Sequence, residues 1–126
     1  MKIHTIEHIE ERLTFIQSIL DAQYDSDDGN LLSQRITEVG AYMAEAGKLK
    51  ADAEFHYHEK LKSEIMEALK SQLPEYSSAT LQNNLVKSLA RHEQHLVTFA
   101  DRVNRTATHQ CGNMITQLSY LKSLPK

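Results

Sequence analysis

The chain has little of what turn-rich or cross-linked folds need. Its 126 residues include no tryptophan, two prolines, four glycines and a single cysteine. So few turn-forming residues favour long regular elements, and with 25% charged residues the composition is typical of solvated helices. Cys111 alone cannot form an intramolecular disulfide, and no stretch approaches the roughly 18 to 20 apolar residues of a membrane span. The sequence predicts an all-α protein without a membrane segment.

The first residues and the charge balance restrict the function classes. Acidic Glu7 lies where a secretion signal needs an apolar run, so we expect a cytoplasmic protein. The 14 basic and 17 acidic residues give a formal net charge of -3 and are mixed along the chain, which argues against a dedicated nucleic-acid clamp. A glycine-rich phosphate loop is absent, and Cys111 lies on an apolar stripe, where a thiol is inert packing. We therefore expect no enzyme activity and no cofactor.

The spacing of apolar residues divides the chain into three helices within one domain, residues 1–126. Stripes with intervals of three and four residues predict helices over residues 5–24, 31–73 and 78–122, with Thr5 as the first N-cap. Turn-forming residues 25–30 end the first helix, and Pro74 ends the second because it removes a backbone donor. At 1.5 Å per residue, each long helix spans roughly 60 Å.

The two long helices are expected to fold back on each other near Ser77 as an antiparallel hairpin. Within one helical turn, this places Ala53 opposite Asp101 and Gly47 opposite Ala107. Gly40 and Gly47 each cost about 1 kcal/mol relative to alanine in a helix interior, which predicts close packing of another helix against them.

The first helix is too short to cover this hairpin. We expect it beside residues 31–50 of the second helix and 104–123 of the third. The predicted architecture is a short first helix packed on a long antiparallel helical hairpin, that is, a three-helix bundle with a protruding two-helix coiled-coil arm.

The arm carries more apolar side chains than one two-helix seam can hide, and exposed apolar surface of several hundred Å² usually marks an interface. We therefore expect self-association, as a dimer or higher oligomer, with another protein as a second class of partner. The predicted interface residues are Phe55, Tyr57, Leu61, Ile65, Met66, Leu69, Leu85, Val86, Leu96 and Val97.

Seven histidines raise the alternative of a metal site. Glu54 and His58 are four residues apart on the second helix, and His92 and His95 are three apart on the third, across the hairpin. Glutamates and histidines from facing helices are the ligands of bundle metal sites, although the repeated Glu-x-x-His pattern of such sites is absent. The simpler interpretation, which we favour, is that these histidines are solvated or make ordinary hydrogen bonds.

Basic residues on the two long helices suggest a second alternative, contact with nucleic acid. Arg102, Arg105 and His109 share one face at intervals of three and four, and Lys48 and Lys50 lie across the hairpin. Together these groups can hold phosphates. Nearby acidic residues can instead pair with them between the helices, and we favour that interpretation.

Three segments carry a resemblance to a known class of proteins. Residues 42–55, 102–110 and 117–122, about a third of the chain, are similar to small helical proteins encoded by bacteriophages and integrated mobile elements. These proteins combine an Ala/Glu/Tyr-rich helix with a second helix that ends in a Leu-Ser-x-x-Lys-like segment. The resemblance implies an accessory role beside phage DNA replication or recombination genes.

The leading interpretation of the sequence is a non-enzymatic, oligomeric helical module that acts by binding proteins. An accessory factor associated with nucleic acid and a metal-binding bundle are the two alternatives.

Overall fold

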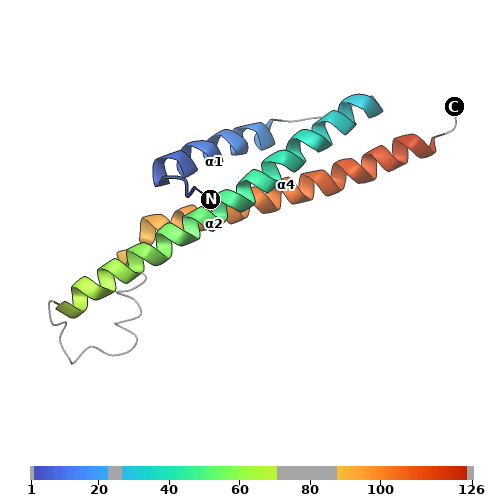
Figure 1. Cartoon of the computed structure of the whole chain (residues 1–126). Helices are drawn as coiled ribbons and strands as arrows, with labels where there is room; N and C mark the ends of the chain where they lie inside the picture. The colour runs from blue at the N-terminus through green and yellow to red at the C-terminus, as the bar shows by residue number, and fades with distance from the viewer. Residues whose placement is uncertain (1, 23–26, 71–87, 125–126) are drawn as a thin grey trace.

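The computed structural model describes residues 2–22, 27–70 and 88–124, and these are helical except at short connections. The described helices are α1 (Ile6–Asp21), α2 (Gly29–Lys70) and α4 (Arg91–Ser123). Helices α2 and α4 form a long antiparallel hairpin, and α1 packs on it (Figure 1). The predicted all-α fold, a short helix on a long hairpin, is confirmed.

Helix α1 is capped at both ends by polar groups. The Thr5 hydroxyl accepts a hydrogen bond from the backbone N–H of His8 at 3.1 Å, as the N-cap prediction requires. At the other end, the Arg35 guanidinium donates to the carbonyl of Ile19 and the Gln110 amide to that of Leu20, both at 2.8 Å. The last carbonyls of α1, which a helix cannot satisfy itself, are thus bonded by α2 and α4.

Helix α2 starts slightly earlier than the sequence predicts. The Asp28 carboxylate accepts a hydrogen bond from the N–H of Asn30 at 2.8 Å, so that α2 begins at Gly29 rather than near Leu31. An acidic residue at this position also complements the positive end of the helix dipole. The predicted stop at Pro74 lies outside the described residues.

The third predicted helix, over residues 78–122, is wrong as one continuous element. Ser88 and Leu89 are helical, but Ala90 has φ −125° and ψ 37°, and α4 begins only at Arg91. No glycine or proline marks this break in the sequence. Ala90 itself is fully buried. Residues 78–87 lie outside the described part.

The core forms where all three helices meet. Its members come from the predicted apolar stripes, and those with no exposed surface are Ile9, Leu13, Ile16, Val39, Ala46, Leu49, Ala100, Val103 and Ala107. Intervals of three and four residues within each helix place these side chains on a single face. The stripe prediction is confirmed for this part of the chain.

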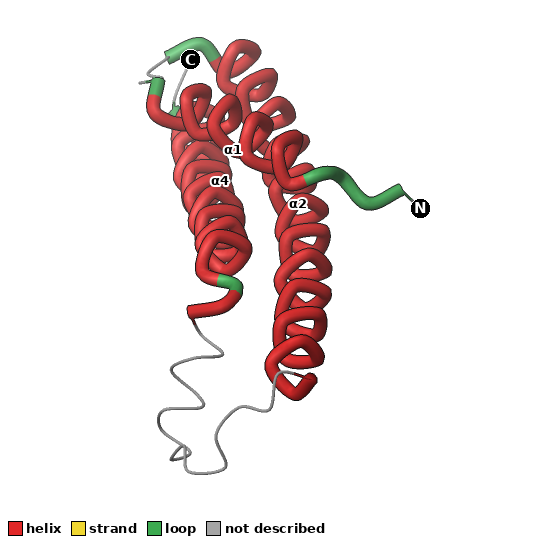
Figure 2. Tube along the Cα trace, turned by 90° about the vertical axis from the view of Figure 1, so that its left-hand side faces the viewer, coloured by secondary structure: helices red, strands yellow, loops and turns green. Residues whose placement is uncertain are grey.

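Helix α1 lies closer to the middle of the hairpin than predicted. Figure 2 shows α1 against both α2 and α4, with α2 continuing well past it. Its contacts on α4 run from Gln110 to His92, whose Nε2 atom is 4.0 Å from Glu10. The expectation that α1 faces residues 104–123 is therefore only partly right. Arg35, about two turns into α2, bonds the end of α1 and so holds α1 toward the middle.

The hairpin register agrees with the prediction to within a helical turn. Lys50 Nζ lies 3.1 Å from the Asp101 carboxylate, whereas Ala53 was expected opposite this residue. Gly47 faces Asn104, and a β-carbon at Gly47 would have its nearest neighbour at 3.7 Å. The close packing predicted at Gly40 is wrong, because a β-carbon there would meet nothing within 4 Å.

Candidate interaction surface

The distal segment of α2, defined here as residues 55–67, projects beyond α1 (Figures 1 and 2). No residue from Tyr57 to Glu67 is buried. Three apolar side chains in the segment are substantially exposed: Phe55 at 46%, Ile65 at 37% and Met66 at 50%. Large apolar groups clustered on one projecting segment indicate a binding surface.

Two faces of the distal segment differ in exposure. Tyr57 and Leu61 are half-buried and continue, at intervals of four residues, the buried side of α2 that includes Ala53. Phe55 and Met66 lie on the opposite side, about three turns apart along the same face. Phe55 and Met66 are therefore directed away from the hairpin seam, whereas Ile65, four residues after Leu61, continues the seam side and is exposed because that side is less covered here.

The predicted interface residues differ in how far the structure exposes them. Phe55, Ile65 and Met66 are exposed, whereas Leu96 is only 1% exposed and belongs to the core, with Val97 packed against that core. Leu96 is therefore wrong as an interface residue, because it lies in the part of α4 that α1 and α2 cover. Leu85, Val86 and the side chain of Leu69 lie outside the described residues.

The basic residues of the nucleic-acid alternative are mostly paired with acids. Lys48 donates to Asp52, while Lys50 and Arg105 both donate to Asp101. The hydrogen bonds from Lys50 and Arg105 lower the pKa of the Asp101 carboxyl. Arg102 and His109 are exposed. With three of the five basic groups facing carboxylates, the surface lacks the concentrated positive charge that phosphate binding requires.

The predicted metal ligands do not form a site. Among the described residues, no three His, Cys, Asp or Glu side chains gather as a metal ion requires. His58, His92 and His95 are exposed, and Glu54 lies 4.0 Å from Lys50 within its own helix. The metal alternative with these four residues is therefore wrong, because the register leaves the imidazoles in solvent instead of directing them to one point.

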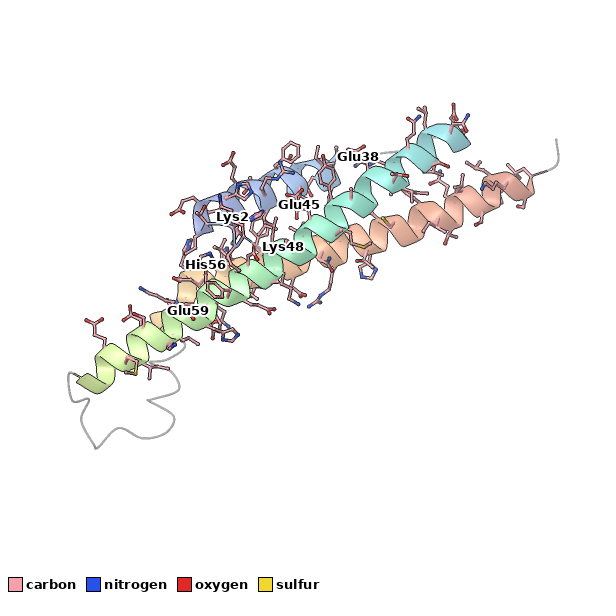
Figure 3. The ribbon with its side chains drawn as sticks, in the orientation of Figure 1. Lys2, Glu38, Glu45, Lys48, His56 and Glu59 are labelled. Atoms are coloured by element: carbon pink, nitrogen blue, oxygen red, sulfur yellow. The ribbon has the colours of Figure 1, made fainter. Side chains whose placement is uncertain are left out.

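Sequence reasoning missed a polar anchor between the N-terminal residues and α2. The Asp52 carboxylate, 1% exposed, accepts the backbone N–H of His4 at 3.0 Å and the Lys48 ammonium. Lys48 also reaches the carbonyl of Lys2 at 3.4 Å, and His56 Nε2 lies 2.6 Å from the carbonyl of His4 (Figure 3). The available signal was the four-residue spacing of Lys48, Asp52 and His56, which places them on one helix face.

The electrostatics of Asp52 follow from this anchor. Burial alone would raise the pKa of Asp52, but the hydrogen bonds from Lys48 and from the His4 backbone outweigh burial and lower it. The carboxylate is therefore ionised and bonded at neutral pH. It fixes residues 2–4 against α2 at the point where the distal segment begins.

A second ion pair fastens α1 to α2. Arg12 forms a fork with Glu45, with N–O distances of 2.6 and 2.8 Å. The hydrogen bonds from Arg12 lower the pKa of the Glu45 carboxyl. Such two-point pairs hold orientation better than single contacts. The middle of the molecule is thus held together by its own polar and apolar contacts, whereas no residue from Tyr57 to Glu67 is buried.

Comparisons with known proteins give no further evidence about this surface. No protein-family model matches the chain, and no curated protein or solved structure matches it. None of the described helices has the length and apolarity needed to cross a membrane.

Proposed function

We propose that this protein is a non-enzymatic helical binding module that acts through protein–protein contacts of the distal segment of α2, first of all with further copies of itself. The observation that carries the proposal is the exposure of Phe55, Ile65 and Met66 on a part of α2 that α1 does not reach. The setting we propose is a phage or mobile element, on the resemblance of residues 42–55, 102–110 and 117–122 alone.

The physical reason is the balance between helix length and available cover. Removing apolar surface from water stabilises by roughly 25 cal/mol per Å². Two helices bury one stripe each, and only a third helix buries the remaining apolar positions. In the middle of the molecule α1 supplies that cover. Among the described residues no third helix covers the distal segment, and the cover we propose is another molecule.

The proposal is tested by the mass of the full chain in solution. Sedimentation velocity and light scattering at roughly 1 to 100 µM, a range that resolves weak complexes, should give a mass that rises above the 14.4 kDa of one chain. The double variant Phe55→Ser/Met66→Ser should remain at 14.4 kDa. A wild-type chain that stays at the monomer mass throughout would remove the basis for self-association.

Ile115→Ser is the matched control. Ile115 is 52% exposed, comparable to Met66, but lies on α4 far from the distal segment. Its substitution removes a similar apolar side chain and should leave the mass unchanged. A loss of association in this variant would show that general surface hydrophobicity, rather than the distal segment, holds the copies together.

A further inference from the structure

The outward face of the distal segment has a symmetric order of side chains. Phe55, Glu59, Lys62 and Met66, named here the outer stripe, follow at intervals of four, three and four residues, so they share one helix face. All four are exposed, and Figure 3 marks Glu59 on the part of α2 beyond α1. Read from either end, the order is apolar, charged, charged, apolar, with opposite signs at the two central positions.

This order is self-complementary when two copies run antiparallel. A two-fold axis between Glu59 and Lys62 places Phe55 of one copy against Met66 of the other, and Glu59 against Lys62. We propose that the outer stripe is the contact of a symmetric antiparallel dimer in this register, an inference that rests on the proposed function. Each dimer then contains two apolar pairs and two equivalent ion pairs.

The charges on the outer stripe are available for such pairing. No salt bridge joins Glu59 or Lys62 to another residue in the described part of the chain, whereas their neighbour Lys60 pairs with Glu64 at 2.9 Å within the helix. A parallel dimer would set Glu59 against Glu59 and Lys62 against Lys62. Like charges facing each other destabilise a helix pair, so the stripe selects the antiparallel orientation.

The N-terminal anchor limits the stripe at one end. Asp52 and His56 bond to residues 2–4 of their own chain, which lie on the anchor side of Phe55. The outer stripe itself, from Phe55 to Met66, is about three helical turns long. Interfaces that bury less than about 1,200 Å² in total are those of weak, transient complexes, and we expect a contact of three turns to belong to that class.

Charge reversal tests the register. Glu59→Lys and Lys62→Glu each place like charges opposite one another at both symmetric positions, so each variant should dissociate with a constant raised by tenfold or more in sedimentation. The double variant Glu59→Lys/Lys62→Glu restores both ion pairs and should dimerise like the wild type. An equal mixture of the two single variants should form a heterodimer, because each then supplies the charge that the other lacks.

Glu67→Lys is the matched control, since Glu67 is exposed and undergoes the same charge change about 100° around the helix from Met66. This variant should dimerise normally. If the wild type associates but neither single reversal weakens it, or the mixture forms no heterodimer, the register is overturned while the proposed function stands. If the wild type is monomeric throughout, both are overturned. Circular dichroism of each variant confirms that helicity is unchanged.

Discussion

The two halves of α2 differ in burial although their apolar spacing is alike. Leu49 and Ala53, in the half beside α1, are 0% and 1% exposed, whereas Leu61 is half-buried and Ile65 is 37% exposed. All four belong to one repeat of four residues in the same helix, with Tyr57 between Ala53 and Leu61. The comparison shows that apolar spacing predicts which face of a helix can be buried. How far that face is buried depends on whether a third helix covers it.

Polar contacts also differ between the half of α2 beside α1 and the distal half. Beside α1, the side chains of α2 bond to other segments: Glu45 to Arg12, Asp52 to the His4 backbone and Arg35 to the Ile19 carbonyl. In the described part of the distal segment, the ion pair of Lys60 with Glu64 lies within one helix and so does not join α2 to another segment. The middle of the molecule is therefore fastened by polar bonds between segments, and we propose that a partner covers the distal segment.

The largest expected effect comes from truncating one apolar side chain in each half of α2. Leu49→Ala should lower the free energy of unfolding by about 3 kcal/mol, because it leaves a cavity in a packed core. Ile65→Ala should lower it by less than about 1 kcal/mol, because the side chain is already partly in water. Urea unfolding followed by circular dichroism at low protein concentration measures both. Equal losses would show that the distal segment is packed as firmly as the middle.

A smaller effect is expected from removing the charge that anchors the N-terminal residues. Asp52→Asn should lower the stability by about 1–2 kcal/mol near neutral pH, because the bonds from Lys48 and His4 to a buried carboxylate are weakened. The pKa of Asp52 is lowered in the folded state. Its contribution is therefore complete above the unfolded-state value of about 3.9 and is lost as the pH falls through the lower folded-state pKa.

The difference between the wild type and Asp52→Asn should accordingly stay constant down to about pH 5 and close below about pH 4. Urea unfolding at a series of pH values measures it. Glu67→Gln, an exposed carboxyl in the distal segment, serves as control and should change the stability by no more than about 0.5 kcal/mol. If the difference in stability between the wild type and Asp52→Asn stayed unchanged in acid, packing rather than the charge of Asp52 would hold the N-terminal residues.

The smallest expected effect concerns the glycines beside α1. Gly40→Ala should raise the stability by up to about 1 kcal/mol, because alanine is the better helix former and its β-carbon meets nothing within 4 Å. Gly112→Ala in α4, equally open, should behave alike. Thermal unfolding measures both. If Gly40→Ala lowered the stability, another helix would pack closely against this position, as the sequence suggested.

The sequence predicted the features that follow from local periodicity. The apolar stripes within the described core and the Thr5 cap are confirmed, because each depends on spacing along a single helix. The hairpin register agrees to within one turn, because a fold-back point between two regular helices sets which positions face each other. The break at Ala90 was missed, because no glycine or proline signals it in the sequence. The metal set failed for a related reason: helix spacing places His92 and His95 near one another but does not fix which way their face points.

The candidate surface was predicted in part. Exposed Phe55, Ile65 and Met66 were identified from an excess of apolar residues, while Leu96 looked equivalent in the sequence and is buried. Leu96 is buried because α1 covers that part of the hairpin, and α1 ends before the distal segment. The position of α1 is set by Arg12, Arg35 and Asp52, whose partners are 16 to 48 residues away in sequence.

By itself, the sequence determined the helices and their apolar faces, because a backbone with so little proline and glycine satisfies its hydrogen bonds locally and its stripes follow from a fixed periodicity. Only the tertiary structure decided which part of each stripe is covered. Covering a stripe requires segments distant in sequence to meet, and the placement of α1 through a few buried polar bonds left the outer face of distal α2 in water.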